Sequence, residues 1–384
     1  MSMRSDWFAA CGVIATTLAA GTPLSAESSA GKVMTVNGPI APEALGMTLP
    51  HEHLIIDYKP ASDTPEGWRA IGGEKPSTAE EIAFYDAPLT MDRIGAAYMG
   101  KPNRDDLRLQ DEVLAIKEVT DYKWSGGGSI VEVTSGGLGR NPQALKRISQ
   151  ATGVNVIMGS GWYEHGFVGD TIDSRSALNL AEEIVRDITV GVGNTGIRAG
   201  IIGEVGVRQA DTPYERKILA AAARASRLTG AAISIHMSKG FHEQRATLKI
   251  LKDAGADLKR VAMGHSNPIA DNMPLMKHVL DQGAYLQFDM LGDPPQILSE
   301  AVDHDVALAI IELIKQGHVD QILLSQDVFT KTDLKAYGGS GYSFVAEQFI
   351  PYLRRLGATQ EQINRMVVDN PRRLLTLARP EAVR

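Results

Sequence analysis

The sequence predicts an α/β fold, a distorted (β/α)₈ or TIM barrel, on three observations. Eight short runs of apolar residues recur along the 384 residues, longer amphipathic segments lie between them, and polar residues follow several of the runs. Strands that alternate with helices pair in parallel, and eight such units form a barrel with its chemistry at the carboxyl ends of the strands. We therefore expect a single barrel domain over residues 27–384.

The expected strands share a compact apolar run, and they are 47–56, 128–135, 155–163, 199–206, 231–238, 260–267, 284–291 and 321–328. Helical periodicity predicts helices over 108–122, 176–189, 213–229 and 305–317, and then near 343–356 and 360–378. An open doubly wound sheet is the competing architecture. The motif GVGNTG at 191–196 does not support it, because the motif follows a helix and leads into a strand, the reverse of a dinucleotide-binding fingerprint.

The first 26 residues are typical of a signal peptide. Arg4 is followed by an apolar run at 7–20 and by small residues, which predicts cleavage after Ala26 and a periplasmic or secreted protein. The single cysteine, Cys11, lies in this segment. No later run is long enough for a transmembrane helix, so we expect no membrane insertion of the mature form. The net charge of −7 argues against nucleic acid as a partner.

A long segment rich in proline, glycine and charge separates the first expected strand from its helix. It covers residues 59–103. A connection of this length is unusual between a strand and a helix in a compact domain. We interpret it as an insertion at the rim of the barrel or a dimer contact, and not as a separate domain.

Ionisable residues stand at the ends of five of the expected strands. His51 and His53 point to the same side of the first strand, with Glu52 between them directed away into the packing beneath the helices. The later strand ends supply Glu204, His236, His265 and Asp327. Each could be a hydrogen-bonded core residue, but buried charges are costly unless they are paired, and divalent cations would offset the cost for all six together.

The cluster therefore predicts a site for two divalent metal ions. Imidazole and carboxylate ligands without thiolate suit zinc best, with manganese or cobalt as alternatives. The sequence has no G-x-S-x-G motif, and no cysteine remains in the mature chain to act as a nucleophile.

This pattern of strand-end residues resembles the amidohydrolase superfamily. The segments PHEHL, GSGWY, AGIIGEVG, QFD and LLSQD resemble the phosphotriesterase family and its homology branch, over about residues 35–376. The resemblance implies a homodimer with two divalent ions in each chain. It implies that His51, His53 and Asp327 hold a buried ion, that His236 and His265 hold an exposed one, and that Glu204 bridges the two.

Three positions depart from the family's pattern. Glu204 stands where phosphotriesterases and related lactonases have a carboxylated lysine, Met290 where the active enzymes have a basic residue, and Pro268 where phosphotriesterases have an aspartate. A glutamate can still bridge two ions. The loss of the basic residue and the aspartate argues against efficient organophosphate hydrolysis and against long-chain acyl-homoserine lactones as substrates.

The expected activity is hydrolysis of a small-molecule ester, lactone or amide by a hydroxide that bridges the two ions, with Asp327 accepting its proton. Expected substrate contacts are Trp162, Tyr163, His165, Lys239 and Met290. Two alternatives stay open: an organophosphate phosphotriesterase, and an exported metal-binding barrel without catalysis.

Overall fold

The protein is seen in a computed structural model that describes residues 29–238, 243–293 and 302–381. The expected signal peptide and Lys239 lie outside these residues. Within the described part of the chain, no helix is both long enough and apolar enough to cross a membrane.

Eight parallel strands surround the centre of the molecule, which confirms the predicted barrel. They are β3 (Met47–Glu52), β6 (Gly127–Glu132), β7 (Asn155–Ser160), β8 (Ile201–Val207), β9 (Ile233–Met237), β10 (Val261–Met263), β11 (Tyr285–Phe288) and β12 (Ile322–Leu324). Their order in the sheet follows the sequence from β3 to β12, with parallel pairing at every step. Each observed strand begins and ends inside a predicted run or within a residue of it.

The barrel closes between its first and last strands through bonds at the ends of the strands. The backbone N–H of His51 donates to the Ser325 hydroxyl over 3.1 Å. The N–H of Asp327 donates to the His51 carbonyl over 3.3 Å, and that of His53 donates to the Val328 carbonyl over 3.2 Å. The seam therefore brings the predicted metal ligands of β3 next to the segment that carries Asp327.

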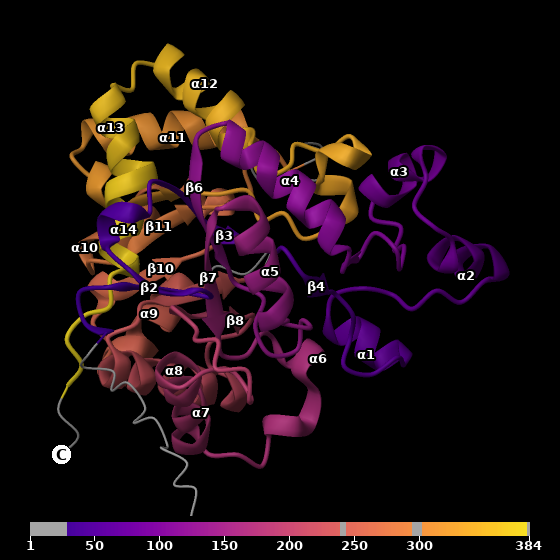
Figure 1. The fold of residues 1–384 in the computed structure, drawn as a ribbon. Helices are drawn as coiled ribbons and strands as arrows, with labels where there is room; N and C mark the ends of the chain where they lie inside the picture. The colour runs from indigo at the N-terminus through magenta and orange to yellow at the C-terminus, as the bar shows by residue number, and fades with distance from the viewer. Residues whose placement is uncertain (1–28, 239–242, 294–301, 382–384) are drawn as a thin grey trace, which may run out of the picture.

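Helices cover the outside of the barrel (Figure 1). The principal ones are α4 (Glu112–Trp124), α5 (Pro142–Thr152), α7 (Ala177–Thr189), α8 (Pro213–Thr229), α9 (Gln244–Asp253), α10 (Met273–Asp281) and α11 (Asp303–Lys315). The side chain of Thr212 caps α8 at its N-terminus, and Gly230 ends it with a φ of 74° that suits glycine. The predicted boundaries of 213–229 are therefore met at both ends.

The C-terminal segment forms α12 (Ile350–Arg355), α13 (Gln360–Asn364) and α14 (Asn370–Leu375). The π-helical turn Val345–Phe349 leads into α12, and a second one, Arg365–Asp369, joins α13 to α14. At the other end of the described chain, β1 (Val33–Thr35) and β2 (Gly38–Ile40) form a hairpin, from which the N–H of Val36 donates to the carbonyl of Val156 on β7. The GVGNTG motif forms the predicted turn between α7 and β8.

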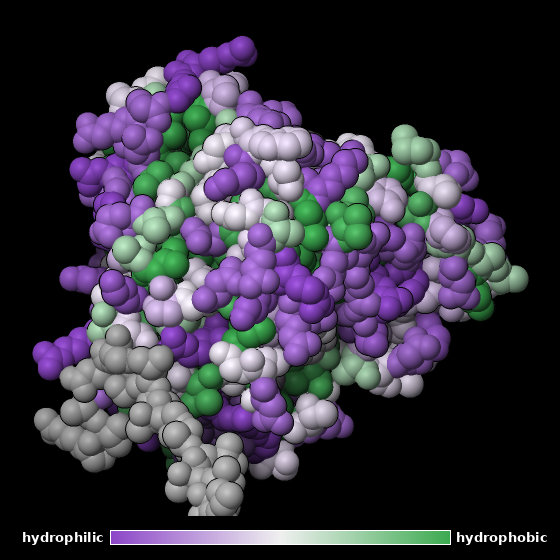
Figure 2. Space-filling model, in the orientation of Figure 1, coloured by the Kyte–Doolittle hydropathy of each residue, from purple (hydrophilic) through white to green (hydrophobic). Residues whose placement is uncertain are grey.

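Residues 59–103, called the insertion below, project from one side of the barrel (Figure 1). They contain α1 (Pro65–Ala70), α2 (Ala79–Asp86) and α3 (Met91–Tyr98), and β4 (Ile56–Asp57) pairs with β5 (Arg108–Leu109) at the base. Asp105, just after the insertion, forms a 2.6 Å ion pair with Lys331 in the loop after β12. The segment is therefore a rim insertion, and its role as a dimer contact stays a prediction. Figure 2 shows a mostly hydrophilic face in this view, with hydrophobic residues scattered across it.

A buried ion pair joins α7 to the strands beside it. Asp187 Oδ2 lies 2.9 Å from Arg140 Nη2 and 2.8 Å from the Ser160 hydroxyl, and Arg140 also donates to the Gly159 carbonyl over 2.8 Å. The side chains of Asp187 and Arg140 are 4% and 13% exposed, so both charges are largely shielded from bulk water.

We predict that Asp187→Ala lowers the free energy of unfolding by about 3–5 kcal/mol, because it leaves the Arg140 charge buried without its partner. Urea denaturation measures this. The matched control is Asp211→Ala, which breaks the exposed pair between Asp211 and Arg216 and should cost less than about 1 kcal/mol. Equal losses in the two variants would contradict the argument.

Candidate metal centre

The six predicted metal ligands meet at the carboxyl-terminal mouth of the barrel. Their ligating atoms form three overlapping groups within 4.8 Å, namely His51–His53–Glu204, His51–His265–Asp327 and Glu204–His236–His265. β3, β8 and β9 carry His51, Glu204 and His236, whereas His53, His265 and Asp327 stand one to three residues beyond their strands. The strand-end prediction therefore holds for the position of every ligand.

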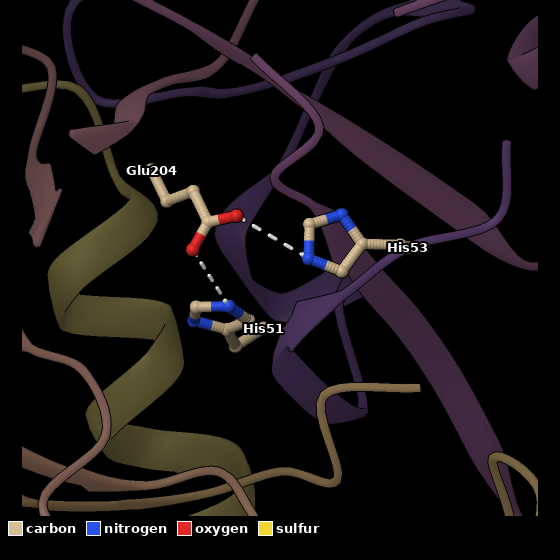
Figure 3. A group of neighbouring side chains, drawn as sticks. All are labelled: His51, His53 and Glu204. Carbon is tan, nitrogen blue, oxygen red and sulfur yellow. Dashed lines mark ion pairs between the residues drawn. The ribbon is translucent and has the colours of Figure 1, made fainter. Parts of the chain in front are cut away.

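Glu204 lies at the centre of the cluster. Its Oε1 is 3.3 Å from His53 Nε2 and its Oε2 is 3.2 Å from His51 Nε2, so the carboxylate spans the two histidines of β3 (Figure 3). The same Oε2 is 3.1 Å from His236 Nδ1. One carboxylate thus reaches ligands of both predicted ions, as a bridging residue must.

The other predicted ligands lie on either side of Glu204. Asp327 Oδ1 is 3.2 Å from His53 Nε2 and 3.4 Å from His51 Nε2. On the other side, His265 Nε2 approaches His236 Nδ1 to 2.7 Å. The side chains of His51 and His53 are 0% and 3% exposed, whereas those of His236 and His265 are 12% and 7% exposed. The division of the ligands between two ions stays a prediction.

Each histidine has its second ring nitrogen held by a polar partner. His53 Nδ1 lies 2.8 Å from the Thr134 hydroxyl. His51 Nδ1 and His265 Nδ1 lie 3.0 and 2.9 Å from the two oxygens of one carboxylate, Asp289. His236 uses its other face, with Nε2 3.2 Å from Glu164. Such contacts fix the ring orientation and the tautomer of metal-binding histidines.

Without a cation, protons balance the charges of the cluster. Burial alone would lower the pKa of His53, but the nearby carboxylates of Asp327 and Glu204 raise that pKa to about 10. Burial would likewise lower the pKa of His236, and Glu204 and Glu164 raise it to about 9. For Glu204, burial favours the neutral form, whereas His51 and His236 hold its pKa well below the usual range. A metal ion would displace these protons.

Buried atoms that lack a well-formed hydrogen bond test whether the residues fit metal ions. Within the described chain, His51 Nε2 and Asp327 Oδ1 are buried and make no hydrogen bond of good geometry, and only ion-pair contacts of 3.2–3.4 Å reach them. Buried polar atoms are costly when they are left unsatisfied, and both of these atoms face the centre of the cluster. Four imidazoles and two carboxylates with their ligating atoms this close are a donor set for divalent cations. The cluster therefore fits a binuclear metal site.

Two of the ligands have an unusual backbone conformation. His265 and Asp327 have φ of 49° and 55°, in the left-handed region that residues other than glycine rarely adopt. Surrounding contacts must hold such residues, which cluster at functional sites. Asp289 holds His265, since its Oδ1 accepts from both the backbone N–H, at 2.8 Å, and the ring.

Glu52 holds the backbone beside Asp327, as Asp289 holds that of His265. Its Oε1 accepts the N–H of Gln326 over 2.8 Å, and its Oε2 accepts the N–H of Val328 over 2.9 Å. The hydroxyl of Ser325 lies 2.7 Å from Oε1. The expectation that Glu52 only points into packing beneath the helices is incomplete, because the buried carboxylate bonds to the backbone on both sides of Asp327. Burial raises the pKa of Glu52 to about 7.

Sequence reasoning missed Asp289 and Glu164 as well as Glu52. Asp289 follows β11 and Glu164 lies four residues after β7, so the strand-end rule could have indicated both. Arg208 holds Glu164 through two contacts of 3.1 and 2.8 Å. Burial would raise the pKa of Glu164, but His236, Ser238 and Arg208 lower it to about 2. No sequence signal indicates Glu52 in this role, because its side chain leaves the barrel interior.

The predicted substrate contacts fall into two groups. Tyr163 and Met290 line the cavity above the cluster, and the Tyr163 hydroxyl is 3.0 Å from His236 Nε2. Trp162 is buried outside the lining, where Arg175 lies over its ring at 5.5 Å. His165 is also outside it, in a 3.3 Å pair with Asp173. Lys239 lies outside the described residues.

The cavity has a volume of about 680 Å³. Its floor contains His53, Glu204, His236, His265 and Asp327, and its outer wall comes from the insertion and the loop after β12. His51 lies beneath this floor and is fully buried. A small molecule in the cavity would therefore meet these five side chains before it could reach His51.

Comparison with known proteins supports this interpretation of the site. Residues 31–375 match the family model described as "Phosphotriesterase family". An N-acetyltaurine hydrolase from Dictyostelium discoideum is 33% identical, over 90% of this chain and 98% of that protein. Solved lactonases and organophosphorus hydrolases are also similar in structure.

Two solved structures are especially similar. A resiniferatoxin-binding protein from Rhodobacter sphaeroides superposes with a TM-score of 0.83 at 37% identity, over 92% of this chain and 96% of that one. The phosphotriesterase homology protein from Escherichia coli, complexed with phosphate in its active site, gives a TM-score of 0.71 at 30% identity, over 87% and 99%.

We predict that Glu52→Gln weakens metal binding about 10–100-fold, because the new amide N–H would face the N–H of Val328 and release the backbone beside Asp327. The free energy of unfolding should also fall by about 1–3 kcal/mol. Competition with a chelator measures the affinity, with the exposed Glu43→Gln as control. Unchanged affinity together with lower stability would show that Glu52 has a structural role only.

We predict different metal losses from two carboxylate variants. Asp289→Asn should weaken the binding of both ions, because Asp289 holds His51 and His265. Glu164→Gln should lower the affinity only for the ion that His236 holds, by about 10–100-fold. After dialysis against a weak chelator, the Glu164 variant should keep about one metal equivalent and the Asp289 variant fewer. The same loss in both variants would contradict the assignment of the two halves.

Proposed function

This chain belongs to the phosphotriesterase family as a metal-dependent hydrolase, and we propose that it hydrolyses a carboxylic ester, lactone or amide of a small molecule. The observation that carries the proposal is the convergence of six candidate ligating side chains, five of which line the floor of one cavity. The relatives support it from another direction, since they include N-acetyltaurine hydrolases, which by name cleave an amide, and a lactonase.

Two divalent cations held by these residues would activate a water molecule and polarise the scissile carbonyl. We propose zinc, on the basis of the imidazole and carboxylate donors. His51, His53 and Asp327 would hold the buried ion, His236 and His265 the exposed ion, and Glu204 both.

Asp327 is the residue placed to move the proton. Its Oδ1 faces His51 and His53, whereas its Oδ2 is 3.9 Å from His265 Nε2, and the side chain is 15% exposed in the cavity floor. We propose that Asp327 accepts a proton from the attacking water and passes it to the leaving group. Tyr163, beside His236, is positioned to contact the substrate over the exposed half of the site.

Organophosphate hydrolysis is the second candidate, since solved organophosphorus hydrolases are similar to this chain. Met290 and Pro268 both line the cavity. Neither side chain can accept or donate a proton, so neither can extend a relay from Asp327. We therefore rank phosphotriester cleavage as a slow side activity.

Export and assembly remain predictions. We propose export on the features of residues 1–26, which N-terminal sequencing of the mature protein tests. We propose a homodimer on the family resemblance, which light scattering tests.

We predict that zinc-loaded protein hydrolyses aryl acetates, lactones or N-acetyl amides faster than paraoxon, and that a chelator abolishes the activity. Asp327→Asn should lower kcat by at least about 100-fold, with metal content measured in the same sample. Faster turnover of paraoxon would reverse the ranking. Tight metal binding with no turnover of any substrate, in wild type and variant alike, would favour a non-catalytic barrel.

A further inference from the structure

Glu132 is a buried carboxylate at the end of β6 that the predicted metal ligands do not include. It and Thr134, two residues further along the chain, are both 0% exposed. Glu132 is the register partner of Glu52 on β3, the residue that immediately precedes His53. Burial of a carboxylate costs free energy unless hydrogen bonds satisfy its oxygens, so the groups that approach Glu132 indicate what this carboxylate holds in place.

One oxygen of Glu132 accepts two hydrogen bonds. Its Oε1 lies 2.5 Å from the Thr134 hydroxyl and 3.3 Å from the backbone nitrogen of Leu54, the residue that follows His53. Its Oε2 is buried and has no hydrogen-bond partner within the described residues. Because the N–H of Leu54 can only donate, it keeps Oε1 an acceptor, and the Thr134 hydroxyl donates to the same oxygen.

The hydroxyl of Thr134 transmits this direction to His53. A hydroxyl has one proton, and Thr134 uses it on Glu132. Toward His53 Nδ1, which is 2.8 Å away, the hydroxyl oxygen therefore offers a lone pair, and Nδ1 must carry a proton. That leaves Nε2 of His53 as the ring nitrogen that can bind a metal ion.

Nε2 of His53 is also the nitrogen that faces the cluster (Figure 3). It lies 3.3 Å from Glu204 Oε1 and 3.2 Å from Asp327 Oδ1. A further contact of His53 holds its backbone only, since its carbonyl accepts the Tyr342 hydroxyl over 2.7 Å. Within the described chain, the Thr134 hydroxyl is thus the group that can set the state of Nδ1.

His53 differs in this respect from two other histidines of the cluster. Nδ1 of His51 and Nδ1 of His265 both face Asp289, and an ionised carboxylate accepts whichever way it turns. A hydroxyl can either donate or accept. Thr134 alone would therefore leave both proton positions open to His53, and Glu132 removes that freedom.

The direction of these bonds is the same whether Glu132 is ionised or neutral. Burial raises the pKa of Glu132 to about 7, against the opposing effects of His53, Thr134 and Leu54. A proton on Oε2, which has no partner, still leaves Oε1 an acceptor. The orientation of the Thr134 hydroxyl is therefore fixed by geometry and not by the titration of the carboxyl group.

We propose that Glu132 is a positioning residue for the buried metal ion, because it turns the Thr134 hydroxyl so that His53 keeps its proton on Nδ1 and presents Nε2 to the cluster. The inference rests on the metal site of the proposed function and not on the reaction at that site. Glu52 and Glu132, paired across β3 and β6, then hold different parts of the predicted ligand set. Glu52 holds the backbone beside Asp327, and Glu132 sets the ring of His53.

Variants of Thr134 test the hydroxyl. Thr134→Val keeps the shape of the side chain but removes the hydroxyl, and it should weaken the binding of the ion that His53 holds about 10–100-fold. Thr134→Ser keeps a hydroxyl and should restore the binding. After dialysis of zinc-loaded protein against a weak chelator, Thr134→Val should retain about one metal equivalent and Thr134→Ser about two. Equal retention in the two variants would overturn the proposal.

Variants of Glu132 separate its acceptor oxygen from its charge. Glu132→Gln keeps an acceptor, because the N–H of Leu54 favours the amide oxygen at the place of Oε1, whereas Glu132→Leu removes the acceptor. Glu132→Leu should therefore bind the buried ion about 10–100-fold more weakly than Glu132→Gln. Losses of the same size would contradict the acceptor role.

The matched control is Ser129→Ala, which removes another buried hydroxyl of β6. The Ser129 hydroxyl donates to the Leu45 carbonyl over 2.7 Å and makes no contact with the cluster. This variant should lose stability but keep both ions. Loss of metal from Ser129→Ala would show that any damage to β6 releases the ion, and it would overturn a specific role for Glu132.

NMR of protein with nitrogen-15 in its histidines gives a readout that a loss of stability alone would not move. In zinc-loaded protein, the Nδ1 proton of His53 should exchange slowly with solvent in wild type and Thr134→Ser, and faster in Thr134→Val and Glu132→Leu. Metal loss from Thr134→Val with this proton still protected would overturn the proposal. Zinc binding in the expected pattern without hydrolysis of any ester would support it while the proposed reaction fails.

Discussion

Charge balance inside the mouth of the barrel is the constraint on which the surrounding structure depends. Glu204 and Asp327 are ionised carboxylates in a region where water cannot solvate them fully. Divalent cations at the centre would balance these carboxylates and would also satisfy His51 Nε2 and Asp327 Oδ1, which lack a well-formed hydrogen bond. The polar groups around the cluster then share one effect, which is to hold its ligating atoms toward the centre of the cluster.

Two buried carboxylates, Asp289 and Glu52, each hold the backbone of one residue of the cluster. Asp289 bonds to the backbone and ring of His265, and Glu52 bonds to the backbone on both sides of Asp327. His265 and Asp327 are also the two residues other than glycine with left-handed backbone in the described chain. Glu52 lies at the seam where β3 meets β12, so the contact that closes the barrel also positions Asp327, a predicted metal ligand.

The sequence alone was sufficient to predict the barrel and the meeting of six ionisable side chains at its mouth, because parallel strands bring their carboxyl ends together wherever the intervening helices lie. It was not sufficient for Glu52 or Arg208, whose roles depend on the reach of a side chain across a seam or between loops. Trp162 shows the same limit. It follows a strand as Tyr163 does, yet only Tyr163 lines the cavity, since neighbouring residues point in different directions. The composition of the sequence was enough to predict where the insertion begins and ends. Its place in the cavity wall depends on tertiary contacts that the sequence does not show.

Metal content and position test the central claim most directly. Purified protein reconstituted with zinc and then dialysed should retain two equivalents per chain, and anomalous diffraction should place one ion between His51, His53, Glu204 and Asp327 and the other between Glu204, His236 and His265. Fewer than about one equivalent, or ions bound away from these six residues, would contradict the account.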